Sequence, residues 1–349
     1  MEIILSLIYL FLILFLIVGA CVLFTNAIEH LGKEFNLSEG AVGSVLAAVG
    51  TALPETIVPL VAIIGAYITG ANIETGKEIG IGAILGAPFM LGTLAFFVTG
   101  AAVLHYTRVN RRTSDMPVNT IIMFRDIHYF VLAYSIAIIS SFIPFFLVKC
   151  FIAVLLIIIY TIYVIKTIRT ASKISDNEEE LEALYFTKHL NFPGAFHVPA
   201  IFLQVFLALI GIIFLAHIFV EQLKFLSEVF RINPLILSLI ITPIATELPE
   251  KFNSIIWIRA KKDTLAMGNI TGAMVFQSCI PTAIGLVLTP WILGVEALVN
   301  VVIVYLSVLV VYLNVLSNKG ILKPSALLSG GLFYLFYLAY ILFKINIIS

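Results

Sequence analysis

Long apolar runs separated by short polar breaks dominate this sequence. A helix of about 20 apolar residues crosses a hydrocarbon core about 30 Å thick. The pattern therefore predicts an all-α membrane protein with ten transmembrane helices. The ten runs are 4–26, 41–69, 80–104, 127–144, 147–166, 199–221, 234–258, 264–289, 294–315 and 324–345.

One long hydrophilic connection, 167–196, separates the first five spans from the last five. We therefore expect a first five-helix repeat at 1–166, an acidic linker at 167–196 and a second five-helix repeat at 197–349. An odd number of spans in each half makes the two halves inverted relative to each other. The acidic residues of the linker are Asp176, Glu178, Glu179, Glu180 and Glu182.

Composition supports the membrane class and excludes others. Of the 349 residues, 61% are hydrophobic and 11% are charged, whereas a soluble domain carries about 25% charged residues. Lysine and arginine together number 20, and aspartate and glutamate also number 20. Because the chain has no excess of basic residues, we do not expect nucleic acid as a partner. The expected surrounding is the lipid bilayer.

The distribution of lysine and arginine among the loops predicts the orientation of the chain. With the N-terminus outside, the inward loops hold 14 of these residues and the outward segments hold five. We therefore expect both termini outside, the 167–196 linker in the cytoplasm, and an integral multi-pass protein of the plasma membrane.

A short motif occurs at equivalent positions of the two halves. GTALPE at 50–55 lies in span two, and ATELPE at 245–250 lies in span seven. Each is followed by a glycine-spaced segment, GAILGA at 82–87 and GNITGA at 268–273. We interpret the glycine spacing as packing notches that let spans three and eight approach the broken helices closely.

The duplicated motif has the composition of a cation site. A carboxylate inside a membrane span is costly and suggests function, and a proline displaces the backbone carbonyl four residues earlier. Carboxylate, hydroxyl and carbonyl oxygens are the ligands that Ca²⁺ and Na⁺ prefer. Broken helices from inverted repeats are typical of secondary transporter sites. The candidate ligands are Glu55, Thr51 and Gly50 in the first half, and Glu250, Thr246 and Ala245 in the second.

At these residues the sequence resembles the calcium/cation antiporter superfamily, sodium/calcium exchanger type. That family carries two repeats with G-T-S-L-P-E followed by G-N-x-x-G-S-N, and the resemblance covers roughly 40–92 and 235–280. It implies a ten-helix inverted repeat that exchanges Ca²⁺ for Na⁺ by alternating access, without enzyme activity or cofactor. It also implies coordination by the two motif glutamates, by threonine and serine oxygens, and by a polar residue on the third and eighth helices.

The sequence departs from the family pattern at several oxygen ligands. The motif serine is Ala52 in the first repeat and Glu247 in the second, and the serines of the glycine motif are alanines. The polar position falls at Leu91 on span three and at Gln277 on span eight. Gln277 is therefore the side-chain oxygen donor that we expect from these two spans.

Glu247 leaves two interpretations open. It stands four residues before Lys251, in the favourable order for a helical ion pair, or it serves as a third cation ligand. If the pair forms, Glu55 and Glu250 leave two negative charges, which match one Ca²⁺, two Na⁺ or two protons. Apposed carboxylates in low dielectric also raise each other's proton affinity.

Two alternatives to sodium/calcium exchange follow. A Ca²⁺/H⁺ antiporter would use the same fold and the same two carboxylates. An intramembrane enzyme would use Glu55 and Glu250 as an acid/base pair, although the sequence offers no nucleophile or metal-ligand set for such chemistry.

Overall fold

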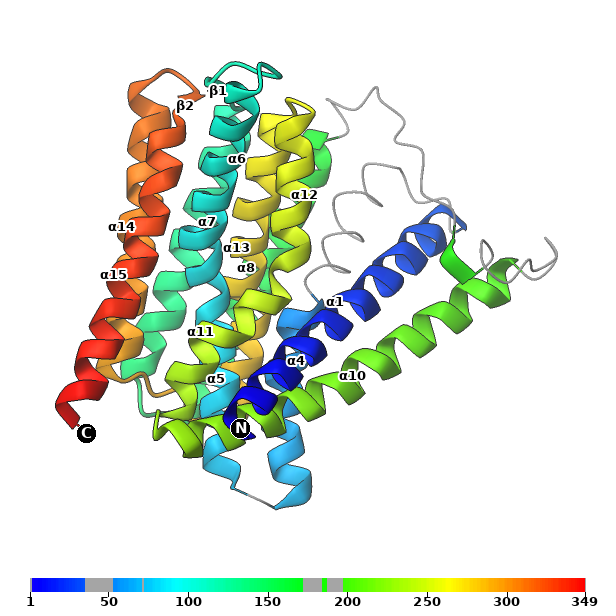
Figure 1. The fold of residues 1–349 in the computed structure, drawn as a ribbon, viewed down its shortest axis with the longest axis vertical. Coiled ribbons are helices and arrows are strands. Elements are labelled where there is room, and N and C mark those ends of the chain that lie inside the picture. Colours follow the sequence, from blue (N-terminus) through cyan, green and yellow to red (C-terminus); the bar gives the residue numbers. More distant parts are fainter. Residues whose placement is uncertain (1, 35–52, 71, 172–183, 187–196, 349) are drawn as a thin grey trace.

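The computed structural model describes residues 2–34, 53–70, 72–171, 184–186 and 197–348. They form a bundle of helices, and the described connections between the helices are short (Figure 1). The first part of predicted span two, 41–52, and most of the acidic linker, 172–183 and 187–196, lie outside these residues. The helices are α1 (Glu2–Glu34), α4 (Leu53–Thr69), α5 (Ile73–Met90), the π-helical η2 (Leu91–Ala95), α6 (Phe96–Arg108), α7 (Thr120–Ile139), the 3-10 helix η3 (Ser140–Phe142), α8 (Phe146–Ala171), α10 (His197–Phe230), α11 (Pro234–Thr246), α12 (Leu248–Arg259), α13 (Asp263–Leu288), α14 (Val295–Ser317) and α15 (Pro324–Ile348).

The multi-pass membrane class is confirmed. Eight helical segments of the described chain are long and apolar enough to cross a membrane, and they coincide with predicted spans one, three to six and eight to ten. Two shorter apolar helices, Glu55–Thr69 and Pro234–Ile244, lie in predicted spans two and seven. The ten-span count and the inversion of the halves stay predictions.

A small sheet that the sequence pattern did not predict joins two connections at one end of the bundle. Strand β1 (Met116–Pro117) pairs antiparallel with β2 (Ile321–Leu322). Both termini lie at the opposite end of the bundle (Figure 1). The two paired connections were predicted to share one side of the membrane, and the sheet fits that expectation.

A buried ion pair brings a third connection to the end that carries the sheet. Arg112, in the connection after α6, donates from Nη1 to Asp263 Oδ1 at 2.7 Å and from Nη2 to Oδ2 at 2.8 Å. The side chains are 2% and 3% exposed. This bidentate pair fixes the turn between α12 and α13 to the turn after α6.

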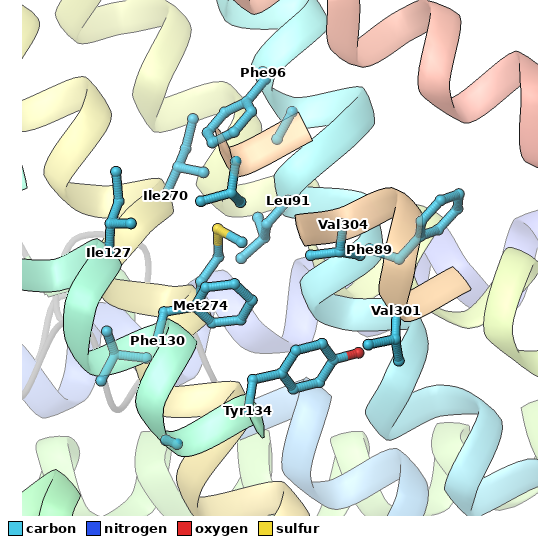
Figure 2. Packing of buried hydrophobic residues seen from close by; sticks show 14 of the residues in the cluster. Phe89, Leu91, Phe96, Ile127, Phe130, Tyr134, Ile270, Met274, Val301 and Val304 are labelled. Atoms are coloured by element: carbon cyan, nitrogen blue, oxygen red, sulfur yellow. The ribbon is translucent and has the colours of Figure 1, made fainter. Parts of the chain in front are cut away.

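Two apolar clusters hold the helices together. The larger one lies among α5 to α8 and α13 to α15 and includes Phe89, Phe130 and Met274 (Figure 2). The smaller one joins α1, α4 and α10, and α1 and α10 run side by side at an angle to the other helices (Figure 1). Because lipid is as apolar as these side chains, close packing contributes much of the helix association.

The packing role expected for the first glycine pair is confirmed. A Cβ added at Gly82 would lie 2.2 Å from the Leu235 carbonyl oxygen, and one at Gly86 would lie 2.2 Å from that of Leu239. Both carbonyls belong to α11, so α5 and α11 touch backbone to backbone. For the second pair the packing role stays a prediction, because residues 41–52, the first part of predicted span two, lie outside the described residues.

Candidate cation-binding site

The second Leu-Pro-Glu triplet begins a helix, since Leu248 is the first residue of α12. The first triplet begins the described part of α4 at Leu53, and residues 35–52 lie outside the described residues. Between α11 and α12 the backbone of Glu247, with φ −89° and ψ 3°, interrupts the helix. A proline at the start of a helix lacks an N–H that would have no helical partner there. The predicted break in span seven is therefore observed: α11 ends at Thr246, and a new helix, α12, begins at Leu248.

The helix start after Glu247 places a carboxylate where backbone electrostatics favour it. Glu250 is the third residue of α12. The N-terminus of a helix carries a partial positive charge, which stabilises a nearby anion. A carboxylate at such a position can remain ionised inside the membrane more readily than one in the middle of a helix.

Three buried side chains from distant parts of the chain meet at one atom. Gln277 Nε2 donates to Glu55 Oε2 at 2.7 Å and to Glu247 Oε1 at 2.6 Å. Glu55 is 3% exposed, and the other two residues are fully buried. The site thus brings together α4, the break between α11 and α12, and α13.

The structure answers part of the question about Glu247. This residue contacts the same amide as Glu55, so it belongs to the site. Lys251 is also buried, and its Nζ lies 3.5 Å from the Pro243 carbonyl oxygen. An ion pair between Glu247 and Lys251 stays a prediction.

The other predicted ligands are placed only in part. Thr246 is buried, and its Oγ1 donates to the Thr242 carbonyl at 3.3 Å. The structure describes the backbone of Ala245 and Glu250 within their helices but not their side chains, and Gly50 and Thr51 lie outside the described residues.

Two further prolines, which sequence reasoning missed, follow site residues. Pro59 stands four residues after Glu55, and Pro281 stands four residues after Gln277. Proline has no N–H, so neither site residue receives the ordinary helical hydrogen bond at its carbonyl. The Gln277 carbonyl instead accepts a bond of 3.0 Å from the hydroxyl of Thr282. The sequence signal was a proline four positions after Glu55 and another four positions after Gln277.

The third span contributes an apolar side chain at its equivalent position. Leu91 begins the π-helical segment η2, is fully buried, and lies in the apolar cluster with Phe96 and Met274 (Figure 2). This position supplies no side-chain oxygen, as the sequence indicated. A π-helical turn is common near functional sites, and the Gly92 carbonyl within it accepts a bond of 2.5 Å from Ser307 Oγ.

A further buried carboxylate, which the sequence reasoning did not single out, links α7 and α13. Asp126 Oδ2 accepts from Thr271 Oγ1 at 2.9 Å, and Oδ1 accepts from Arg125 Nη2 at 2.9 Å. Thr271 belongs to the glycine-spaced segment and precedes Gln277 on the same helix. This network holds α13 against α7 at a position six residues before Gln277.

The fold and site together define a class. A multi-pass helical protein with two buried carboxylates that meet at a helix break has the construction of a secondary transporter of cations. The chain belongs to the sodium/calcium exchanger protein family, whose profile matches residues 5–169 and 200–346. It is therefore a membrane transporter of the cation antiporter class and not an enzyme, and the intramembrane-enzyme alternative is wrong.

Comparison with individual proteins agrees with this family. The chain is 24% identical over 268 residues to the inner membrane protein YrbG of Escherichia coli strain K12, which covers 76% of this chain and 74% of YrbG. The fold is similar to that of the H⁺/Ca²⁺ exchanger CAX, with a TM-score of 0.75 and 16% identity over 98% of this chain and 85% of CAX. It is also similar to the sodium-calcium exchanger NCX_Mj, soaked with Na⁺ and Sr²⁺, with a TM-score of 0.59 and 20% identity over 96% of this chain and 98% of NCX_Mj.

Proposed function

We propose that this protein exchanges Ca²⁺ for Na⁺ across the membrane by alternating access. The observation that carries the proposal is the convergence of Glu55 and Glu247 on Gln277 in a fully buried position. Glu55 comes from the first half of the chain and the other two residues from the second. A cation held there would lie between the halves, as alternating access requires.

The proposed ligand set combines side chains that the structure describes with groups that lie outside the described part of the chain. Glu55, Glu247 and Gln277 supply side-chain oxygens at the observed cluster. Glu250, third in α12, adds a further carboxylate. The hydroxyls of Thr51 and Thr246 and the carbonyls of Gly50 and Ala245 complete the oxygen set that a hard cation prefers.

The proposed architecture is a ten-helix inverted repeat with units 1–166 and 197–349 and a cytoplasmic linker at 167–196. The family profile supports this division, since its two matched segments stop at 169 and resume at 200. The bacterial inner-membrane relative supports a plasma membrane location. Both termini then lie outside, opposite the end that carries β1 and β2.

A second candidate function is Ca²⁺/H⁺ exchange in the same fold. The specific observation that favours it is the apolar character of Leu91, which lies in the core where a polar ligand was expected. Losing an oxygen from span three leaves fewer ligands for Na⁺, whereas protons need only the carboxylates. The substrate Ca²⁺ is the same in both candidates.

Reconstitution in proteoliposomes tests the proposal. We expect an outwardly directed Na⁺ gradient to drive uptake of radioactive Ca²⁺, and Glu55→Gln to abolish it. Glu221→Gln serves as a matched control, because Glu221 is an exposed carboxylate that pairs with Lys224.

The outcomes separate the candidates. Ca²⁺ uptake that depends on an imposed pH difference and does not change with the Na⁺ gradient would establish Ca²⁺/H⁺ exchange. Ca²⁺ flux that needs no opposing gradient would contradict antiport. Absence of Ca²⁺ flux, with Glu55→Gln indistinguishable from the unmodified protein, would overturn the assignment of the site.

A further inference from the structure

The orientation of the Gln277 amide follows from its neighbours. Two carboxylate oxygens lie at hydrogen-bond distance from one end of this amide. A carboxylate is an acceptor, and only the NH₂ end of a glutamine can donate. Nε2 therefore faces both glutamates, and each of its two N–H groups serves one of them.

The amide nitrogen stands where a cation would bind. Its distances to Glu55 Oε2 and Glu247 Oε1 are 2.7 and 2.6 Å, while Ca²⁺ binds oxygens at about 2.3–2.6 Å. Because these ranges nearly coincide, the nitrogen and a Ca²⁺ ion cannot both lie between the same two oxygens.

From this geometry, and resting on the proposed function, we propose that the Gln277 amide substitutes for the cation in the cation-free transporter. Its NH₂ group bridges Glu55 and Glu247 while the site is empty. When Ca²⁺ enters, the NH₂ group leaves that position and Oε1 turns to the ion as a ligand.

The carbonyl end of the same amide is suited to that exchange. Gln277 Oε1 is buried and accepts no hydrogen bond from the described residues. A buried oxygen of this kind is costly to leave unbonded. A bound cation would satisfy it, so the cation-bound arrangement recovers an interaction that the cation-free arrangement lacks.

The backbone at Gln277 is also suited to local rearrangement. Pro281 removes the helical N–H donor to the Gln277 carbonyl, and Thr282 Oγ1 replaces it. A hydroxyl on a side chain can follow a small displacement of its acceptor more easily than a helical N–H can. The helix is therefore held at this residue by an adjustable bond.

The bridge has a consequence for exchange. It ties α4, from the first half, to the break between α11 and α12, from the second, through α13. An antiporter must not reorient while empty, because that movement would uncouple the two ions. A bridge that forms only in the cation-free protein provides such a restraint between the halves.

Nuclear magnetic resonance of the full chain in detergent micelles tests the substitution. The sequence contains three glutamines, Gln204, Gln222 and Gln277, so glutamine-selective ¹⁵N labelling yields three side-chain NH₂ groups. Gln277→Met assigns one of them. If that variant does not fold, Gln204→Met and Gln222→Met assign the signals by elimination.

The expected result is a selective change on adding CaCl₂. In cation-free protein both Gln277 amide protons resonate downfield, because both bond to carboxylates, and saturating Ca²⁺ moves them upfield. Gln204 is the internal control, since its Nε2 is buried and donates to Leu23 O and Asn26 Oδ1, away from the site. Its signals should not move.

Two failures are distinguishable. If calorimetry detects Ca²⁺ binding but the Gln277 signals stay in place, the amide is not displaced and the inference is wrong, while the proposed function stands. If the protein binds no Ca²⁺, the proposed function fails, and the inference fails with it.

Discussion

The close contact between Gly86 and α11 predicts that the substitution Gly86→Ala lowers both stability and Ca²⁺ affinity. The added methyl group would lie 2.2 Å from the Leu239 carbonyl oxygen and 2.7 Å from Pro243 Cγ. An ordinary contact needs at least 3.4 Å. Because the first atom belongs to the backbone, no change of rotamer relieves the overlap, and α5 and α11 must separate.

The magnitude follows from the cost of overpacking. Inserting a methylene into a packed core costs about 1–3 kcal/mol. Glu247 lies one turn beyond Pro243, so a displacement of α11 carries this carboxylate away from Gln277. We expect a lower melting temperature for Gly86→Ala and a loss of about tenfold in Ca²⁺ affinity, which corresponds to about 1.4 kcal/mol.

Thermal unfolding and calorimetric titration of the purified protein measure both effects. Gly65→Ala is the matched control, because Gly65 lies in α4 and a Cβ there would meet no described heavy atom within 4 Å. Equal melting temperatures and equal Ca²⁺ affinities for the two variants would refute the backbone contact between α5 and α11.

Three further substitutions test separate parts of the structure. Arg112→Met should cost about 3–5 kcal/mol because it leaves Asp263 buried without its bidentate partner; thermal unfolding measures this, and the double variant with Asp263→Leu should recover much of the loss. Glu247→Gln removes one negative charge from the site and should weaken Ca²⁺ binding in calorimetry by about tenfold or more, whereas unchanged affinity would exclude Glu247 as a ligand. Thr282→Val leaves the Gln277 carbonyl without its donor and should lower stability by about 1–3 kcal/mol; a melting temperature equal to that of the unmodified protein would show that the hydroxyl is dispensable.

The sequence predicted the class of fold because apolar length is a local property. Each predicted span needed only a run of residues, and eight such segments are present in the described chain. The break in span seven was also predictable, since proline acts on its own helix. The form of the break was not predictable, because the motif alone does not distinguish a kink from a new helix. In the structure a new helix begins after Glu247.

The contacts within the site could not be derived from the sequence. Gln277 was identified through a family pattern, which indicates a position but no bonding partner. Its bridge joins residues 222 and 30 positions away, and only tertiary packing decides that both lie on the same nitrogen. The ion pair between Arg112 and Asp263 and the network around Asp126 escaped prediction for the same reason.

The packing of α5 against α11 explains why a glycine motif and a proline occur together. Pro243 removes the N–H that would bond the Leu239 carbonyl, and no water is present in the membrane core to replace it. That carbonyl faces Gly86, where the absence of a side chain lets the α5 backbone approach and its Cα–H groups offer weak hydrogen bonds. The glycine thus lowers the cost of the proline that precedes the helix break. Glycine on one helix and proline on its neighbour therefore act as one unit that makes an interrupted helix tolerable inside a membrane, and the interruption is what positions Glu247 beside Glu55.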